Sequence, residues 1–356
     1  MKKILITGGA GFVGSNLAIL LKNDEGQNAR IIALDNLKRR GSELNLPRLR
    51  QNGVEFVHGD IRNIDDLLEI GKIDLILECS AEPSVLAGYS GSPEYLIQTN
   101  LAGTVNCLEI ARRHGADIVF LSTSRVYPIK AINEIKYEEN ETRFSISKNQ
   151  QIKGASENGF SEDLSLDGTR SLYGATKLCS ELLLQEYIEI YGIRGIINRC
   201  GVITGPWQMG KVGQGVVVLW VARHIFEKEL SYIGYNGTGK QVRDILHVQD
   251  LYRLLKIEIN QISKYNGKVY NVGGGIDVSV SLCELTDLCQ KITGKSVRIK
   301  SVKENRAGDI PYYISDCSRV QKATGWKPGI NCIRIVSDIS EWINKNKSDL
   351  YPIIGK

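Results

Sequence analysis

The chain alternates short apolar runs with longer amphipathic stretches, and this rhythm constrains its fold more than any other feature. Amphipathic segments separate five runs rich in β-branched residues: KILIT, RIIALD, VEFVHGD, IDLILECS and DIVFLSTS. Strands that are apolar on both faces are typical of a parallel sheet that helices cover on each side. We therefore predict an α/β fold built on a doubly wound parallel sheet.

The rhythm continues toward the C-terminus in discontinuous pieces. We expect a strand over GIINRCGV and helices near residues 14–22, 94–114, 172–192, 249–261, 281–293 and 333–345. A chain of 356 residues is long enough for two lobes. We predict one domain from residues 1–204 and 241–275, and a smaller C-terminal α/β lobe that binds substrate from residues 205–240 and 276–356.

Residues 129–170 interrupt the rhythm with a polar and charged insertion of weak periodicity. The insertion is too long for an ordinary connection, which usually spans about two to six residues. It can form a solvated surface loop or hairpin, or a flap or oligomer contact beside a functional site. The sequence leaves both possibilities open.

The composition excludes several classes of protein. Apolar residues make up 42% of the chain and charged residues 24%, as in ordinary globular proteins. The net charge of +5 comes without a clustered basic face or an aromatic ladder, so we expect no nucleic-acid partner. Eight cysteines without a CxxC pair, together with only four histidines, predict reduced thiols and no metal site. No apolar run approaches the roughly 18 residues of a membrane span, so we expect no membrane partner and a cytoplasmic protein.

A glycine-rich segment, ILITGGAGFVGSNLA, joins the first predicted strand to the first predicted helix. Gly8 allows a tight turn, Gly11 lets backbone N–H groups approach a pyrophosphate, and Gly14 lets the helix pack on the strand. The N-terminus of the helix adds the positive end of its dipole. This spacing predicts a dinucleotide site of Rossmann type.

Asp35, at the end of the second predicted strand, indicates which dinucleotide binds. Its carboxylate would accept hydrogen bonds from the adenosine ribose and would repel a 2′-phosphate, which favours NAD over NADP. The basic run Lys38, Arg39 and Arg40 argues for NADP, but it lies in a loop rather than at the strand tip. We therefore predict NAD, and we expect Asp60, after the third strand, to face the adenine amino group.

Tyr173 and Lys177 lie four residues apart and therefore share one face of a predicted helix. A free tyrosine has a pKa near 10, so a tyrosinate base at neutral pH needs about 4 kcal/mol of stabilisation. An ammonium about 4 Å away supplies roughly that amount at an effective dielectric of 20. Such pairs also occur where a surface tyrosine packs on a lysine stem. Thr123 favours the catalytic interpretation, because it ends the fifth strand and its hydroxyl could bond the reacting oxygen.

Together these motifs resemble the extended short-chain dehydrogenase/reductase family, which contains nucleotide-sugar epimerases and dehydratases. The resemblance spans nearly the whole chain and includes, in the family's order, GTGKQVRDILHVQDL, YNVGGG, RAGD and GWKP. It implies tightly bound NAD and a catalytic set of Thr123, Tyr173 and Lys177. The NAD contacts that it implies are Gly8, Gly11, Phe12, Val13, Gly14, Asp35, Asn36, Asp60, Ile61, Ser80, Ala81, Asn100, Ser122, Tyr173, Lys177, Cys200 and Val202.

The resemblance also implies a nucleotide-diphosphate sugar as substrate. Arg243 and Arg306 would reach the diphosphate, because a forked guanidinium suits a pair of phosphate oxygens. Each arginine could instead form a surface ion pair with Asp244 or Asp309. His247 is expected to be structural. The remaining implied substrate contacts are Ser124, Arg125 and Gln214, although Arg125 could instead pair with Glu82 or Glu162.

The residues ahead of Tyr127 bear on the reaction. Sugar 4,6-dehydratases of the family carry Thr-Asp-Glu at the positions of Thr123, Ser124 and Arg125, so this chain lacks the carboxylates for water elimination. UDP-galactose 4-epimerases keep an asparagine where this chain has Val202. The segments STSRVY, AEPSVLAG, GFSEDLSLDGTRSLYGATK and NRCGVITGPWQMGKVGQGV more closely resemble a subgroup of CDP-sugar 2-epimerases.

The subgroup resemblance implies that the chain epimerises C2 of a CDP-deoxyhexose through a transient 2-keto sugar, with no net oxidation. Three alternatives remain: a nucleotide-sugar 4-epimerase, a reductase or dehydrogenase that releases its cofactor, and a non-catalytic nucleotide-binding regulator on the same fold. Members of the family commonly form dimers, so a homo-oligomer, dimer or tetramer, is also expected.

Overall fold

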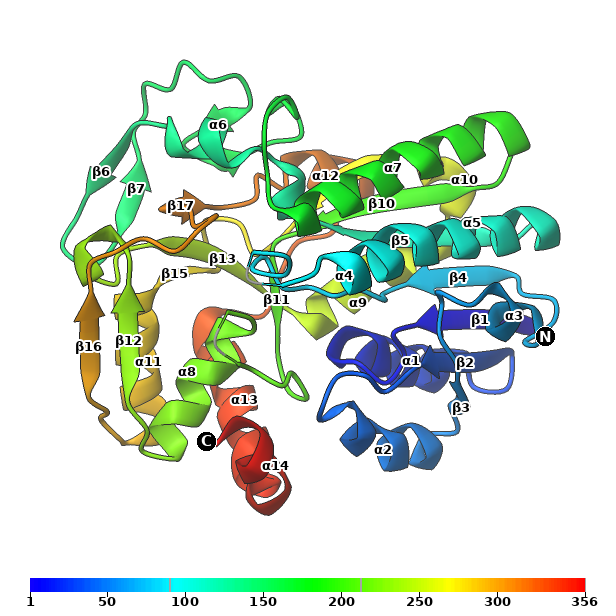
Figure 1. Cartoon of the computed structure of the whole chain (residues 1–356), viewed down its shortest axis with the longest axis horizontal. Coiled ribbons are helices and arrows are strands. Elements are labelled where there is room, and N and C mark those ends of the chain that lie inside the picture. The colour runs from blue at the N-terminus through cyan, green and yellow to red at the C-terminus, as the bar shows by residue number, and fades with distance from the viewer. Residues whose placement is uncertain (90, 212, 356) are drawn as a thin grey trace. The chain divides into compact units, whose positions relative to one another are not determined.

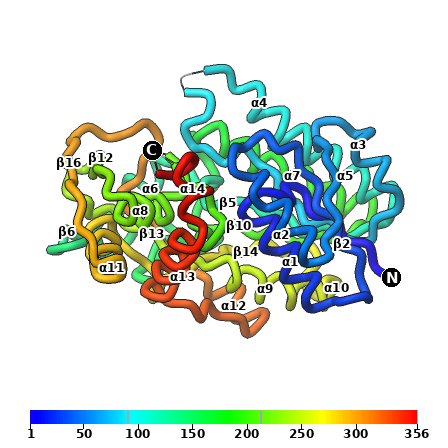
Figure 2. The backbone as a smooth tube through the Cα atoms, turned by 90° about the horizontal axis from the view of Figure 1, so that it is seen from below, coloured from blue at the N-terminus to red at the C-terminus, as the bar shows by residue number. Residues whose placement is uncertain are grey.

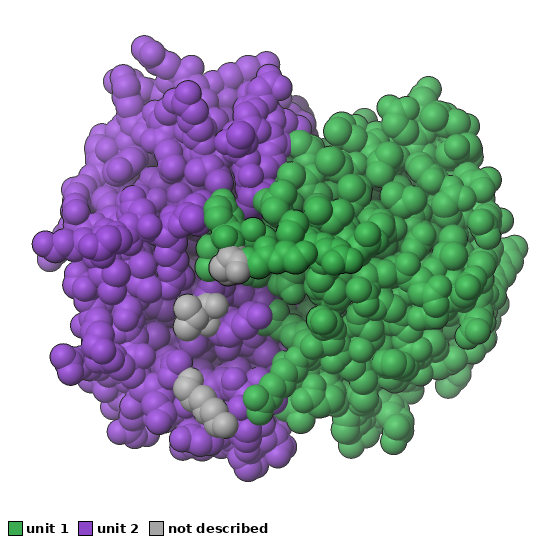
Figure 3. Space-filling model, in the orientation of Figure 1, with its two compact units in different colours: residues 1–126, 172–199, 252–270 green, residues 127–171, 200–251, 271–356 purple. Residues whose placement is uncertain are grey.

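The computed structural model describes residues 1–89, 91–211 and 213–355. These residues form two compact units, coloured separately in Figure 3. Unit 1 comprises Met1–Val126, Leu172–Arg199 and Tyr252–Tyr270, and unit 2 comprises Tyr127–Ser171, Cys200–Leu251 and Asn271–Lys356. The second unit is similar in length to the first, and it includes residues 127–171.

A seven-stranded sheet with the strand order β14-β10-β5-β4-β1-β2-β3 forms the centre of unit 1. Figure 1 labels six of its strands: β10, β5, β4, β1, β2 and β3. The pairings among β1, β2, β3, β4 and β5 are all parallel. Chain order reverses between β1 and β4, and ligands of such sheets bind beyond the carboxyl ends of the strands at that point. The predicted doubly wound sheet of Rossmann type is confirmed. Its strands are β1 (Lys2–Thr7), β2 (Ala29–Asp35), β3 (Glu55–His58), β4 (Leu75–Glu78), β5 (Asp117–Thr123), β10 (Gly195–Cys200) and β14 (Val269–Val272).

Helices cover both faces of this sheet. On one face, α5 and α7 pack side by side over a core that includes Ile76, Ile118 and Phe120. On the other face, the side-chain amide of Asn198 on β10 donates a hydrogen bond to Glu258 on α9. The helices that accompany the sheet are α1 (Phe12–Glu25), α2 (Asn45–Gln51), α3 (Ile64–Leu68), α4 (Glu94–Ile97), α5 (Gly103–His114), α7 (Leu172–Tyr191), α9 (Val248–Asn260) and α10 (Ile262–Tyr265).

Unit 2 contains a four-stranded sheet, in which β11 (Val202–Thr204), β15 (Ser279–Ser281) and β17 (Tyr312–Tyr313) connect through β13 (Val242–His247). A separate pair joins β12 (Leu230–Ile233) to β16 (Ile299–Val302). The helices α8, α11 and α13 pack against one another, as Figures 1 and 2 show. The helices of unit 2 outside residues 127–171 are α8 (Val216–Ile225), α11 (Leu282–Thr293), α12 (Ser318–Thr324), α13 (Cys332–Lys345) and α14 (Lys347–Ile354).

The insertion at residues 129–170 folds as part of unit 2. Phe160 is fully buried, stacks on Tyr313 with ring centroids 5.3 Å apart, and donates its N–H to the carbonyl of Ile314. Arg143 forms an ion pair with Glu284 at 2.6 Å. The segment is therefore not a simple solvated loop, although it does contain the expected hairpins. Its elements are α6 (Ile129–Asn133), β6 (Tyr137–Glu139), β7 (Phe144–Ile146), β8 (Ala155–Ser156) and β9 (Gly159–Phe160).

Three further observations bear on the expectations from composition. Among the described residues, no helix is both long and apolar enough to cross a membrane. No three His, Cys, Asp or Glu side chains in the described part of the chain come together as metal ligands could. All eight cysteines are free thiols, and four of them are buried.

Candidate functional site

The turn between β1 and α1 accepts only glycine at its key positions. Gly8 has a φ of +62°, which a residue with a side chain rarely adopts. A Cβ at Gly14 would lie 2.2 Å from the carbonyl oxygen of Gly8, and one at Gly9 would lie 2.6 Å from Cα of Ala33. The turn therefore brings the N-terminus of α1, with Phe12 and Val13, against the carboxyl edge of the sheet. The backbone N–H groups of this turn and of the helix N-terminus can bind a dinucleotide pyrophosphate.

Asp35, at the end of β2, lies beside the same turn. Its carboxylate accepts hydrogen bonds from the backbone N–H of Ala10 at 3.1 Å and of Leu37 at 2.8 Å. Burial raises the pKa of Asp35, and these amide bonds oppose the rise. These two hydrogen bonds connect the glycine turn to the end of β2. The Asp35 carboxylate therefore lies at the position expected for an acid that binds the adenosine ribose. Gly9 and Ala10 were not singled out from sequence, since nothing in the glycine spacing marks them.

Asn36 and Asp60, both predicted NAD contacts, meet at the neighbouring strand end. The Asn36 amide donates to Asp60 at 2.8 Å, and Arg62 forms an ion pair with the same carboxylate at 2.6 Å. Burial alone would raise the pKa of Asp60, but the bonds from Arg62 and Asn36 lower it to about 2. Lys38 lies 4.6 Å from the ring centroid of Tyr95, so the first residue of the basic run faces an aromatic ring.

Asn100 connects two predicted NAD-contact segments. It sits fully buried in a π-helical turn, Gln98–Ala102, between α4 and α5. Its side-chain oxygen accepts from the N–H of Glu82 at 2.8 Å, and its amide donates to the hydroxyl of Thr176 at 3.3 Å. A π-helical turn often marks a functional position in a helix. Asn100 thereby fixes the strand-end segment of Ser80 and Ala81 to the first turns of α7.

The predicted catalytic residues all lie in unit 1, on β5 and α7. Thr123 is the last residue of β5, and its hydroxyl oxygen accepts the N–H of Arg125 at 3.2 Å, which leaves the hydroxyl proton available to donate. Tyr173 lies half-buried in the first turn of α7, which packs on β5. Lys177, one turn later, is 1% exposed. Side chains of these types can transfer a proton to or from a substrate oxygen.

Lys177 has a partner that the sequence analysis missed. Its ammonium lies 3.3 Å from the carboxylate of Glu78, the last residue of β4, and 4.0 Å from the ring centroid of Phe120. Glu78 is fully buried, and burial raises its pKa although Lys177 acts to lower it. The signal was present, because a glutamate in the apolar run IDLILECS is unusual for a buried strand.

Ser122, expected at the cofactor, turns its hydroxyl inward to Glu181. Glu181 is 1% exposed and forms an ion pair with Arg199 at 2.7 Å. This buried network joins β5, α7 and β10. Any contribution of Ser122 to NAD binding would therefore come from its backbone.

The predicted substrate arginines belong to unit 2. Arg243 of β13 forms an ion pair with Asp309 at 3.1 Å and donates to the carbonyl of Ile310 at 2.7 Å. Asp309 donates its N–H to the carbonyl of Arg306, which closes the RAGD turn. Arg243 and the segment of Arg306 therefore lie together, and Asp309 is the carboxylate with which a diphosphate would compete for Arg243.

The other predicted contacts in unit 2 lie on separate segments. Gln214 pairs with Lys211 through two backbone hydrogen bonds. Cys200 is buried at the end of β10, and Val202 begins β11. His247 is 2% exposed, accepts the N–H of Gln249 at 3.1 Å, and has a pKa lowered by burial, which agrees with the structural role expected for it.

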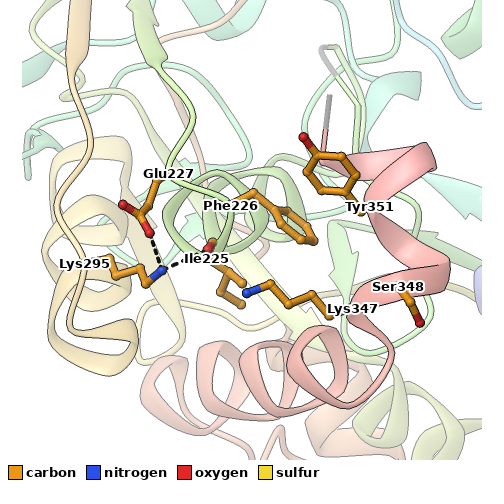
Figure 4. Close-up of a pocket in the computed structure, with 7 residues that line it drawn as sticks. All are labelled: Ile225, Phe226, Glu227, Lys295, Lys347, Ser348 and Tyr351. Atoms are coloured by element: carbon orange, nitrogen blue, oxygen red, sulfur yellow. Dashed lines mark hydrogen bonds and ion pairs between the residues drawn. The ribbon is translucent and has the colours of Figure 1, made fainter.

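Unit 2 also has a groove of about 560 Å³ at the end of α8 (Figure 4). Within it, Lys295 is occupied by bonds to Glu227 and to the carbonyl of Ile225. None of the predicted site residues lines the groove. The residues that line it are Ile225, Phe226, Glu227, Lys295, Lys347, Ser348 and Tyr351.

Comparison with known proteins supports the same family. The sequence profile of the NAD dependent epimerase/dehydratase family matches residues 4–273. CDP-paratose 2-epimerase of Salmonella typhi is 31% identical over 96% of this chain and 98% of its own length. dTDP-glucose 4,6-dehydratase of Salmonella typhimurium is 28% identical over 98% of this chain and 96% of its own.

A solved structure agrees with the fold. A double mutant of a dTDP-glucose 4,6-dehydratase from Streptomyces venezuelae, solved with NAD bound, superposes with a TM-score of 0.79 and is 26% identical. The match covers 98% of this chain and 99% of that one. The predicted family is confirmed, and NAD is the cofactor of that family. The chain belongs to the NAD-dependent epimerase/dehydratase family.

Proposed function

We propose that this chain is a nucleotide-sugar epimerase that inverts C2 of a CDP-deoxyhexose through a transient 2-keto sugar. The observation that carries the proposal is the end of β5, where Ser124 and Arg125 follow Thr123 in the chain. Water elimination needs an acid and a base at this position, and the chain offers a hydroxyl and a guanidinium. The 31% identity to CDP-paratose 2-epimerase supports C2 over the other carbons.

Three side chains of unit 1 carry the proton transfer. Tyr173, as phenolate, takes the proton of the C2 hydroxyl, and Lys177 stabilises the phenolate by its positive charge. Thr123 donates its free hydroxyl proton to the oxygen that alternates between alcohol and ketone. NAD, which the β1–α1 turn and Asp35 would hold, would supply reversible hydride transfer at C2. Because the cofactor would be regenerated in each turnover, it would stay bound.

The nucleotide diphosphate is held by unit 2 in this proposal. Arg243 presents a guanidinium that Asp309 and two backbone carbonyls already orient. A diphosphate can replace Asp309 as the partner of the guanidinium, while the hydrogen bonds to the two carbonyls keep the arginine in place. Arg306, from the adjoining turn, supplies a second positive charge. The active protein is proposed to be a homo-oligomer.

A panel of CDP-, UDP- and GDP-sugars tests the substrate and the carbon. Purified protein is incubated with each sugar in D₂O, and the products are followed by NMR. Inversion at C2 of a CDP-sugar without solvent deuterium is the expected result. Deuterium at the inverted carbon would indicate enolisation, and inversion of a UDP-sugar at C4 would replace the proposed activity with 4-epimerisation.

Removing the base tests the role of Tyr173. Tyr173→Phe should lower kcat by about 10²- to 10⁴-fold while NAD remains bound, since only the ionisable oxygen is lost. Tyr191→Phe, on the exposed end of the same helix, is the matched control and should keep full activity. Unchanged turnover in Tyr173→Phe would rule out the proposed mechanism.

A further inference from the structure

The charge of Lys177 poses a physical problem inside unit 1. The side chain of Lys177 is 2% exposed and that of Glu78 is 0% exposed, so neither charge is solvated by water. A buried ammonium without a counter-charge tends to lose its proton, because burial disfavours the charged form. The proposed function requires the opposite, since Lys177 must stay positive to stabilise the phenolate.

Two neighbouring strands hold the ammonium. Glu78 ends β4 and accepts a hydrogen bond from Lys177 at 3.3 Å. Phe120, its partner in register on β5, places its ring 4.0 Å from the same nitrogen, which adds a cation–π attraction. Burying the Glu78 carboxylate costs free energy of folding, because an apolar side chain at this position of the buried strand would pack without a desolvation penalty.

The other ionisable groups around the pair do not replace Glu78. On α5, the Cys107 thiol interacts with both charges, but burial raises its pKa well above its usual range and keeps it neutral. On α7, Glu181 follows Lys177 by one turn and is already neutralised by Arg199 at 2.7 Å. On β1, Thr7 is the register partner of Glu78 and carries no charge. Within the described residues, Glu78 is the carboxylate that forms an ion pair with Lys177.

We infer that Glu78 is the permanent counter-ion that keeps the buried Lys177 charged and in place. Tyr173 can balance Lys177 only while it is a phenolate, and in the proposed reaction it becomes a neutral phenol once it has taken the sugar proton. Glu78 balances the ammonium in both halves of the cycle, including the half in which the hydride returns. It is therefore a positioning residue, and this role rests on the proposed function of Tyr173 and Lys177.

The test measures the protonation of Lys177 directly. Protein with ¹⁵N-labelled lysine, loaded with NAD, is titrated by NMR, and the Lys177 ammonium signal is assigned by its absence in Lys177→Arg. In Glu78→Gln, which keeps the shape but removes the charge, Lys177 should lose its proton at least one pH unit lower, a tenfold change in the protonation equilibrium. Glu78→Asp keeps the charge and should stay close to the unsubstituted protein.

The control is Glu186→Gln, which removes one negative charge from the exposed face of α7 and should leave the Lys177 titration unchanged. An unchanged Lys177 titration in Glu78→Gln would overturn the inference. The alkaline limb of the kcat–pH profile should shift together with the NMR titration. A purely structural role of Glu78 would instead lower the stability of the Glu78→Gln variant and leave the NMR titration and the kcat–pH profile unchanged.

A measurement on the unsubstituted protein guards against a variant that does not fold. The ¹³C signal of the Glu78 carboxyl should report a carboxylate at neutral pH, and a protonated carboxyl there would overturn the inference. Neither NMR titration needs a sugar substrate. If no sugar is epimerised, the proposed function fails while the Glu78–Lys177 pairing is still tested.

Discussion

At the scale of single residues, the candidate site depends on what each polar side chain already bonds. Thr123 accepts the N–H of Arg125 and so keeps a proton to donate, whereas the neighbouring Ser122 gives its proton to Glu181. Two adjacent hydroxyls on one strand therefore differ in their hydrogen bonding. The alternation of side chains along a strand explains this difference, because Ser122 and Thr123 point to opposite faces.

The role of Thr123 can be tested by an isosteric change. Thr123→Val removes the hydroxyl at nearly constant volume and should lower kcat by about 10²-fold or more, because the reacting oxygen loses its hydrogen-bond donor. Thr123→Ser keeps the hydroxyl and should retain most of the activity. The measurement is the initial rate of sugar inversion, and equal rates for the valine and serine variants would contradict the assigned role.

At the scale of elements, the β1–α1 turn leaves no room for an added carbon atom at Gly14. The helix begins against the strand only because no Cβ separates them at Gly14. The positive end of the helix dipole is thereby brought to the strand edge, where a pyrophosphate can accept its N–H groups.

A single methyl group tests this packing. Gly14→Ala places a Cβ 2.2 Å from the carbonyl oxygen of Gly8 and should lower the free energy of unfolding by about 1–3 kcal/mol, with a loss of NAD affinity. Gly91→Ala is the control, since nothing lies within 4 Å of its Cβ. Calorimetry measures both quantities, and normal NAD binding by Gly14→Ala would show that the turn can relax.

At the scale of the whole molecule, one buried carboxyl should govern part of the pH dependence of stability. Glu258 of α9 is fully buried, and one of its carboxyl oxygens accepts a hydrogen bond from the Asn198 amide at 2.8 Å. Burial raises its pKa from 4.5 to about 8. Between these values the unfolded chain has released the proton while the folded chain retains it, so the free energy of unfolding falls as pH rises and levels off above pH 8.

Glu258→Gln should remove this dependence. Relative to the unsubstituted protein, the variant should gain stability progressively from about pH 5 to pH 8, by on the order of a few kcal/mol in total. Denaturant unfolding at several pH values measures the difference. A difference that stays constant across this range would mean that Glu258 titrates normally in the folded protein.

Local pattern determined much of this protein. The spacing of apolar residues predicted the strands and helices of the doubly wound sheet, since burial on both faces requires uniform apolar strands. The glycine spacing predicted the NAD turn, and the four-residue spacing predicted that Tyr173 and Lys177 share a face of α7. Each of these properties depends on residues that are close in the chain.

Only the tertiary structure decided which polar groups meet across the chain. Glu78 and Lys177 are 99 residues apart in sequence, and Arg243 and Asp309 are 66 apart. The packing of residues 129–170 into unit 2 likewise depends on distant partners such as Tyr313 and Glu284. Periodicity and motif spacing describe neighbours within a few turns, whereas a buried ion pair forms wherever the fold brings two charges together without water.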